Sequence, residues 1–338
     1  METIQDLDLI TLQEQTLDQS INFNPQTFND YIGQDALKDK LRIYVQAAKM
    51  RNEPLDHVLL FGPPGLGKTT LAVIIAHEMA VPIKICSGPT LERTGDLVAI
   101  LSSMDAQTVL FIDEIHRMPS NVEEVLYNAM EQFKIDVIIG QGAGAKSISL
   151  PISPFTLIGA TTKSGLISAP LRSRFGITER FDFYTDEALA AIIQQNARFL
   201  EFHIHADAAL LLARCARGTP RIAKKLLRRI RDFAQVHKEQ ADYAFTLKSL
   251  GLLGITEDGL TTIDRTILQI VVEKFKGGPV GLDTIAAVIG EDADTIETVY
   301  EPFLMRQGYL EKTSRGRQIP AALLPQLIKK FLGQHTFI

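Results

Sequence analysis

Residues 62–69 read GPPGLGKT and combine the residue types that a bound phosphate group needs. The glycines allow backbone N–H groups to close around phosphate oxygens at the start of a helix. Lys68 can then reach the terminal phosphates, and the Thr69 hydroxyl can ligate Mg²⁺. An apolar run precedes the loop and a helix is predicted over 70–79, which is the context this motif requires. The loop therefore predicts a site for ATP and Mg²⁺.

Carboxylates and hydroxyls follow two further apolar runs of the sequence. Asp113 and Glu114 come directly after VLFI at 109–112, and Thr161 and Thr162 follow a later run. In open α/β sheets, ligands bind at the carboxyl ends of the strands. We predict that Asp113 holds Mg²⁺ through water, that Glu114 polarises the attacking water, and that a threonine hydroxyl orients that water.

Three arginines are candidates for contacts with phosphate. Arg221 lies in the first turn of a helix predicted to begin at Pro220, where the helix dipole disfavours a cation. The phosphates of a bound nucleotide would offset that cost. Arg172 and Arg174 follow the last predicted strand on a predicted loop, and one of them is a candidate arginine finger for a neighbouring subunit.

The elements that must position these residues predict an α/β chain with more than one domain. Continuous apolar runs alternate with helix-length stretches, which is typical of a parallel sheet covered on both faces. The predicted strands are 57–61, 82–85, 109–112 and 156–158, and a helix over 35–50 precedes them. Helical periodicity replaces the strands after residue 183 and continues over 207–216 and 220–236. Helices at 262–275, 282–289 and 294–306, followed by a polar hairpin over 309–319, predict a winged helix.

Four parts are therefore expected along the chain. They are a polar tail (1–22), a large parallel-sheet domain (23–183), a small helical domain (184–255) and a winged-helix domain (256–338). A hairpin insertion is predicted over 135–150, with a turn through Gly140, Gly142 and Gly144. Its apolar surface exceeds what a solvated hairpin should show, so it packs either on its own domain or on a partner.

Composition excludes several classes of protein. Among 338 residues, 46% are hydrophobic, and no apolar stretch approaches the ~20 residues that a membrane helix needs. The acidic start lacks the features of a secretory signal, so a cytoplasmic location is expected. Cys86 and Cys215 have no metal-ligand spacing. The net charge of -5 means that any DNA must be bound by a local basic patch.

That patch is predicted on the wing. The third helix of the winged-helix domain carries Asp294, Glu297 and Glu301, so phosphates would repel it and sequence-specific readout is not expected. The cations lie on the hairpin instead, which suits contact with the DNA backbone irrespective of sequence. These cations are Lys312, Arg315 and Arg317.

Several short segments in a fixed order carry a resemblance to a known family. They are YIGQ at 31–34, the phosphate loop, LFIDEIHR at 110–117, FTLIGATT at 155–162, APLRSRFG at 169–176, FYT at 183–185, RGTPR at 217–221 and RGR at 315–317. As a set they resemble the AAA+ ATPases and, within them, the RuvB family of Holliday-junction branch-migration motors. The resemblance covers residues 23–338.

The resemblance implies roles for individual residues. Thr162 matches the sensor-1 position, Arg174 the finger that acts in trans, and Arg221 the sensor-2 arginine. The implied nucleotide-binding residues are Tyr31, Ile32, Gly62, Pro63, Pro64, Gly65, Leu66, Gly67, Lys68, Thr69, Thr70, Tyr184, Pro220 and Arg221. The resemblance also implies a homo-hexameric ring around duplex and four-way junction DNA, and a hairpin that docks on a RuvA-type junction-binding protein.

Other functions within the same superfamily remain as alternatives. A protein unfoldase would need an aromatic pore loop, and residues 88–95 contain no aromatic residue. A clamp loader would end in a helical collar rather than a winged helix. A non-catalytic binding module would be expected to lack Glu114 or the arginine finger.

Overall fold

The computed structural model describes residues 24–139 and 146–332. The described residues form two compact units: those up to 201 with 218–224, and 202–217 with those from 225 onward. The predicted polar tail lies outside the described residues. Within the described ranges, no helix is both long enough and apolar enough to cross a membrane.

The first unit is built on a parallel five-stranded sheet in the order β2-β3-β6-β1-β7. The strands are β1 (Val58–Phe61), β2 (Ile83–Ser87), β3 (Val109–Asp113), β6 (Thr156–Thr161) and β7 (Ile177–Arg180). The first four confirm the predicted strands. The fifth was not predicted, because only alternate residues of this edge strand are buried and the apolar run is too short to stand out.

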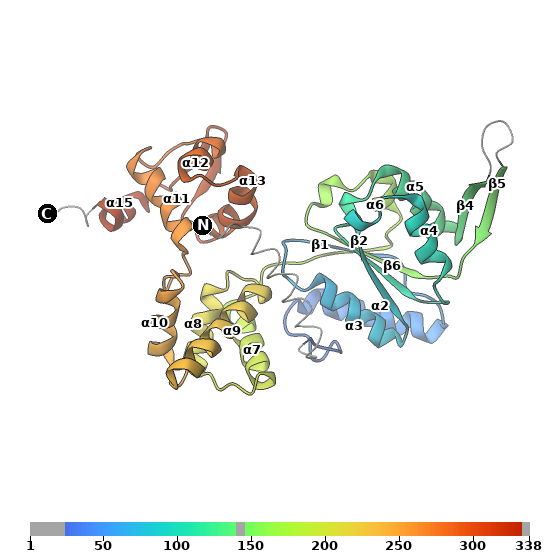
Figure 1. Ribbon diagram of the computed structural model, residues 1–338, viewed down its shortest axis with the longest axis horizontal. Coiled ribbons are helices and arrows are strands. Elements are labelled where there is room, and N and C mark those ends of the chain that lie inside the picture. The colour runs from blue at the N-terminus through green and yellow to red at the C-terminus, as the bar shows by residue number, and fades with distance from the viewer. Residues whose placement is uncertain (1–23, 140–145, 333–338) are drawn as a thin grey trace. The chain divides into compact units, whose positions relative to one another are not determined.

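Helices cover both faces of the sheet (Figure 1). On one side lie α2 (Asp35–Arg51) and α3 (Lys68–Met79), and on the other α4 (Thr94–Ser102), α5 (Ser120–Gln132) and α6 (Ala169–Ser173). This double cover explains why β1, β3 and β6 are almost wholly buried and mostly apolar. Arg172 and Arg174, predicted on a loop, instead lie within and directly after α6.

The predicted insertion is a two-stranded antiparallel hairpin. It is formed by β4 (Lys134–Ile139) and β5 (Lys146–Pro151), and it projects away from the five-stranded sheet (Figure 1). Ile148 and Leu150 are 43% and 41% exposed, so much of each side chain is open to solvent. The predicted glycine turn lies outside the described residues.

The middle of the chain is helical, as predicted. It contains α7 (Asp186–Phe199), α8 (Ala206–Cys215), α9 (Pro220–His237) and α10 (Tyr243–Leu252). The last of these helices was not predicted. It packs on α8 in the second unit, and its residues Phe245 and Leu250 are buried.

A winged-helix fold completes the second unit. Its helices are α11 (Thr262–Glu273), α12 (Leu282–Ile289) and a third segment made of α13 (Ala293–Thr295), a π-helical turn (Ile296–Tyr300) and α14 (Glu301–Arg306). The wing is formed by β8 (Glu311–Thr313) and β9 (Gly316–Gln318). The last described helix, α15 (Leu324–Leu332), was not predicted and packs on α11.

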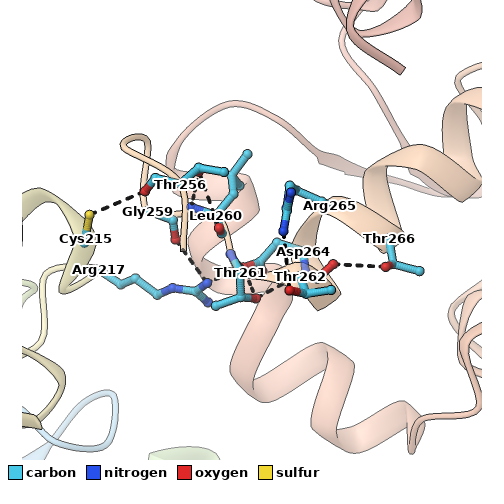
Figure 2. A network of polar contacts seen from close by, with 10 residues as sticks. All are labelled: Cys215, Arg217, Thr256, Gly259, Leu260, Thr261, Thr262, Asp264, Arg265 and Thr266. Atoms are coloured by element: carbon cyan, nitrogen blue, oxygen red, sulfur yellow. Dashed lines mark hydrogen bonds and ion pairs between the residues drawn. The ribbon is translucent and has the colours of Figure 1, made fainter. Parts of the chain in front are cut away.

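Arg217 fastens the end of α8 to the winged-helix domain (Figure 2). Its guanidinium group bonds to the Asp264 carboxylate, donates to the Gly259 carbonyl at 3.2 Å, and lies 4.4 Å above the Phe303 ring. Asp264 is fully buried and also caps α11 through the Thr261 hydroxyl and N–H. A buried carboxylate needs such a partner, so this pair couples two elements that are distant in sequence.

Candidate nucleotide-binding site

The phosphate loop joins β1 to α3 and is held by its own lysine. The Lys68 ammonium group donates to the carbonyl oxygens of Gly62 and Pro63, both at 2.9 Å. Burial lowers the pKa of Lys68 to about 8, and the nearby Asp113 carboxylate acts in the opposite direction. Phosphate oxygens can replace the two carbonyls as acceptors, and their negative charge would favour the ammonium form.

Two glycines of the loop allow close approach to residues from distant parts of the sequence. Gly67 has φ 99°, and a Cβ there would lie 2.8 Å from the Tyr31 hydroxyl oxygen. Gly65 has φ 76°, and a Cβ there would lie 2.8 Å from Thr219 Cγ2. The N–H of Arg221 donates to the Gly65 carbonyl at 3.3 Å. The loop therefore contacts both Tyr31, one of the implied nucleotide-binding residues, and the start of the helix that carries the predicted sensor-2 arginine.

Tyr31 and Tyr184 meet beside the loop. Their hydroxyl oxygens are 2.9 Å apart, and the carbonyl of Leu66 lies within hydrogen-bond distance of both, at 3.4 and 3.1 Å. Burial raises the pKa of Tyr31 well above its ordinary value and that of Tyr184 to about 12. Both phenols therefore stay protonated and neutral near pH 7. The Tyr184 N–H also donates to the Gly218 carbonyl at 3.0 Å, next to Pro220 at the start of α9.

The two predicted carboxylates lie at the end of β3. The Glu114 N–H donates to Asp113 Oδ1 at 2.9 Å, and Glu114 itself has a left-handed backbone with φ 48°. This conformation turns the chain sharply and is uncommon for a residue with a side chain. The Glu114 carboxylate accepts from Arg117 at 2.9 Å in an exposed pair. Such a pair contributes little stability, so Glu114 can exchange Arg117 for a water molecule.

The two candidate threonines differ in their surroundings. Thr161 is buried, and its hydroxyl lies 2.9 Å from His116 Nδ1 and accepts from the Lys163 N–H at 3.0 Å. Thr162 is exposed just past β6, the neighbour of β3 in the sheet. Desolvation lowers the pKa of His116. This contact of His116 was not predicted. Its position two residues after Glu114 could have indicated that it lies near the site.

The proposed Mg²⁺ ligands suit that ion chemically. Thr69 supplies a hydroxyl in the first turn of α3, and Asp113 supplies a carboxylate close enough to influence the pKa of Lys68. Mg²⁺ prefers oxygen ligands and is usually bound through one or two protein oxygens together with substrate phosphates. The residues present therefore fit this ion.

The guanidinium group of Arg174 is held by residues of α5 and α6. Among the described residues, its contacts are with Glu131 at 3.1 Å, with the Pro170 carbonyl at 2.7 Å, and with the Tyr127 ring at 4.8 Å. These contacts lie on α5 and α6. This placement is compatible with a finger for a neighbouring subunit rather than for its own site.

The wing differs from the predicted arrangement at Arg317. Its guanidinium group binds Glu301 at 2.5 and 3.1 Å, and the residue is only 8% exposed. The hydrogen bond to Glu301 raises the pKa of Arg317 above the ordinary value of an arginine. Lys312 pairs with Glu297 at 3.0 Å. The structure therefore does not place Arg317 where a phosphate could reach it, because the acidic helix attracts this cation, whereas Arg315 is exposed.

Three family models match the chain in order. The Holliday junction DNA helicase RuvB P-loop domain matches residues 23–181, the RuvB AAA lid domain residues 184–256, and the RuvB C-terminal winged helix domain residues 257–323. These boundaries lie within two residues of the predicted divisions at 183 and 255.

Individual relatives agree with the family models. The RuvB subunit of the Holliday junction branch migration complex from Ligilactobacillus salivarius is 51% identical over 321 residues, covering 95% of this chain and 94% of its own length. The solved Thermotoga maritima RuvB branch migration motor is 47% identical with a TM-score of 0.79, covering 90% of this chain and 98% of that chain. A point variant of the same Thermotoga protein gives a TM-score of 0.81 at the same identity and coverage. This chain binds nucleotide through a P-loop and belongs to the RuvB family of AAA+ ATPases.

Proposed function

We propose that this chain is the ATP-driven motor subunit that moves duplex DNA through a ring and thereby drives branch migration of Holliday junctions in recombination and repair. The observation that carries the proposal is the combination of the three matched domains with the loop, carboxylates and arginines that ATP hydrolysis needs. A clamp loader would explain the nucleotide site but not the winged-helix domain.

The residues of this chain divide the work of hydrolysis. Lys68 and the loop N–H groups bind the phosphates. Tyr31 and Tyr184 enclose the adenine base of the nucleotide. Glu114 orients and polarises the attacking water, and Thr162 supplies a hydroxyl beside it. When bound at Thr69 and Asp113, Mg²⁺ would neutralise phosphate charge.

Two arginines connect hydrolysis to assembly. Arg221 couples the state of the bound nucleotide to α9, because its N–H donates to the Gly65 carbonyl of the phosphate loop. Arg174 reaches the nucleotide of the next subunit in a homo-hexameric ring, where a guanidinium group stabilises the charge of the transition state. A ring is required because an isolated subunit lacks this group at its own site.

Two exposed surfaces bind the partners. Arg315 on the wing contacts the DNA backbone irrespective of sequence. The apolar residues of hairpin β4–β5 dock on a RuvA-type junction-binding protein, which places the ring on the junction. The cytoplasmic location expected from the sequence is part of this proposal.

A four-way junction with homologous arms, labelled so that movement of the branch point changes fluorescence, tests the function. We expect movement only when ATP, Mg²⁺ and the RuvA-type partner are present together. Lys68→Ala should bind nucleotide more weakly and leave the junction stationary. ATP hydrolysis without movement of the branch point under any of these conditions would contradict the proposal.

A further inference from the structure

One face of α5 carries three polar side chains at successive turns of the helix. Glu123, Tyr127 and Glu131 are spaced four residues apart, so they form a single stripe. The stripe faces α6, the short helix that ends at Arg174. None of the three was assigned a function by the sequence motifs.

The first two residues of the stripe fasten the start of α6. Glu123 is only 7% exposed, and its carboxylate accepts from the hydroxyls of Tyr127 and Ser168, both at 2.8 Å. The Ser168 hydroxyl in turn accepts from the Leu171 N–H at 3.3 Å and so caps α6. Removal of Glu123 would therefore loosen the whole helix.

The last two residues of the stripe hold the end of α6. Glu131 Oε1 lies 3.1 Å from Arg174 Nη2, and the guanidinium carbon lies 4.8 Å from the centre of the Tyr127 ring. The Pro170 carbonyl accepts from Nη1 at 2.7 Å. A guanidinium group has five N–H donors, and these contacts leave an N–H on each terminal nitrogen for a phosphate. Glu131 can thus orient Arg174 without occupying all of its N–H donors.

The same stripe leads directly into hairpin β4–β5. After Glu131, helix α5 ends at Gln132, Phe133 turns the chain in a left-handed conformation (φ 51°), and β4 begins at Lys134. The Phe133 carbonyl accepts from the Ile152 N–H at 2.9 Å at the base of the hairpin. A displacement of the hairpin therefore moves the end of α5, and with it the Glu131 carboxylate.

We propose that Glu131 is a positioning residue for the arginine finger Arg174 and that it transmits partner binding at hairpin β4–β5 to that finger. This inference rests on the proposed function, because it takes Arg174 as the finger and the hairpin as the partner surface. It adds a regulatory route from the hairpin to the nucleotide site of the neighbouring subunit.

The test compares Glu131→Ala with Glu124→Ala, an exposed acid on the same helix. Turnover on junction DNA should fall about tenfold in Glu131→Ala, since a small displacement of a catalytic group is costly. Nucleotide affinity should not change, because Glu131 is not at its own subunit's site. Glu131→Gln keeps an acceptor oxygen, so its turnover should lie between that of Glu131→Ala and that of the parent. Glu124→Ala should match the parent.

Mixed rings separate a positioning role from a structural one. Lys68→Ala subunits carry an intact finger, so mixing them with Glu131→Ala subunits should raise turnover above that of Glu131→Ala alone. A defect confined to the variant's own site would instead be diluted by mixing, and turnover would fall. The RuvA-type partner should stimulate the parent and Glu124→Ala but not Glu131→Ala, although it binds all three.

Each failure has a distinct meaning. Arg174→Ala subunits are mixed with Lys68→Ala subunits in the same way. If mixing raises the turnover of Arg174→Ala but not that of Glu131→Ala, the inference alone is overturned. Normal stimulation of Glu131→Ala by the partner would overturn it as well. Absence of recovery for Arg174→Ala in rings shown to be mixed would overturn the finger assignment of the proposed function, and the inference with it.

Discussion

Glu114 combines an unusual backbone with an easily exchanged partner. Its left-handed conformation places the carboxylate past the end of β3, and Arg117 holds it only through an exposed ion pair. Lys68, by contrast, is buried and already occupies the loop through two carbonyl acceptors. We therefore propose different roles for the two residues, phosphate binding for Lys68 and activation of water for Glu114.

Glu114→Gln should separate binding from hydrolysis. Glutamine keeps the size of the side chain but cannot polarise water as a carboxylate does, so turnover should fall by about 10²- to 10⁴-fold. Nucleotide affinity should remain close to that of the parent. Equilibrium binding and steady-state ATP hydrolysis measure the two quantities, and hydrolysis at the parent rate would show that another group serves as base.

Much of the nucleotide site could be predicted at the residue scale because its signals are local. The loop, Asp113 and Glu114 each sit beside the strand that positions them. The contact between Tyr31 and Tyr184 joins residues 153 positions apart, so only the family resemblance pointed to it. The ion pair of Arg317 with Glu301 was not foreseen, because Glu301 lies 16 residues away on another element.

At the scale of elements, the buried pair of Arg217 and Asp264 joins α8 to the winged helix (Figure 2). Arg217→Met would leave the Asp264 carboxylate buried without its cation. Loss of one partner of a buried pair costs about 3–5 kcal/mol, so the free energy of unfolding should fall by that amount. Chemical denaturation followed by circular dichroism measures this change.

Arg214→Met is the matched control for that variant. Arg214 is exposed on α8, three residues before Arg217, and such a surface substitution changes stability by less than about 0.5 kcal/mol. If Arg217→Met were as stable as Arg214→Met, the buried pair would not hold the two elements together.

The hairpin offers a second test at this scale. Ile148 and Leu150 share one face of β5, and Ser149 lies on the opposite face. Ile148→Glu with Leu150→Glu should abolish binding of the RuvA-type partner, because the docking face would carry two charges. Ser149→Glu should bind the partner as the parent does. Binding is measured by calorimetry. If the double variant binds the partner as tightly as Ser149→Glu does, the hairpin is not the docking surface.

The covered strands of the sheet were easier to predict than its edge strand and two of the helices. The buried strands of the sheet are continuous apolar runs because helices cover both faces. The edge strand β7 and the helices α10 and α15 went unpredicted, since their burial depends on neighbours contributed by distant sequence. The π-helical turn at Ile296–Tyr300 has no local signal in the sequence that could have indicated it.

For the molecule as a whole, DNA binding should depend on the one wing cation that is exposed and outside the ion pairs with Glu297 and Glu301. Arg315→Ala should weaken binding to all duplex sequences alike. The plot of log K against log salt should flatten by ~0.9 for each phosphate contact that the substitution removes. Arg317→Ala should instead destabilise the winged-helix domain, because it leaves the Glu301 carboxylate buried alone. An unchanged salt slope for Arg315→Ala would exclude the wing from DNA binding.

The most direct test of the central claim measures ATP turnover against the DNA and partner present. The rate should be measured alone, with linear duplex, with a four-way junction, and with the junction and the RuvA-type partner together. We predict that turnover is highest in the last condition and that Arg174→Ala abolishes the increase. The same turnover in all four conditions would contradict the account, because hydrolysis would then be uncoupled from the junction.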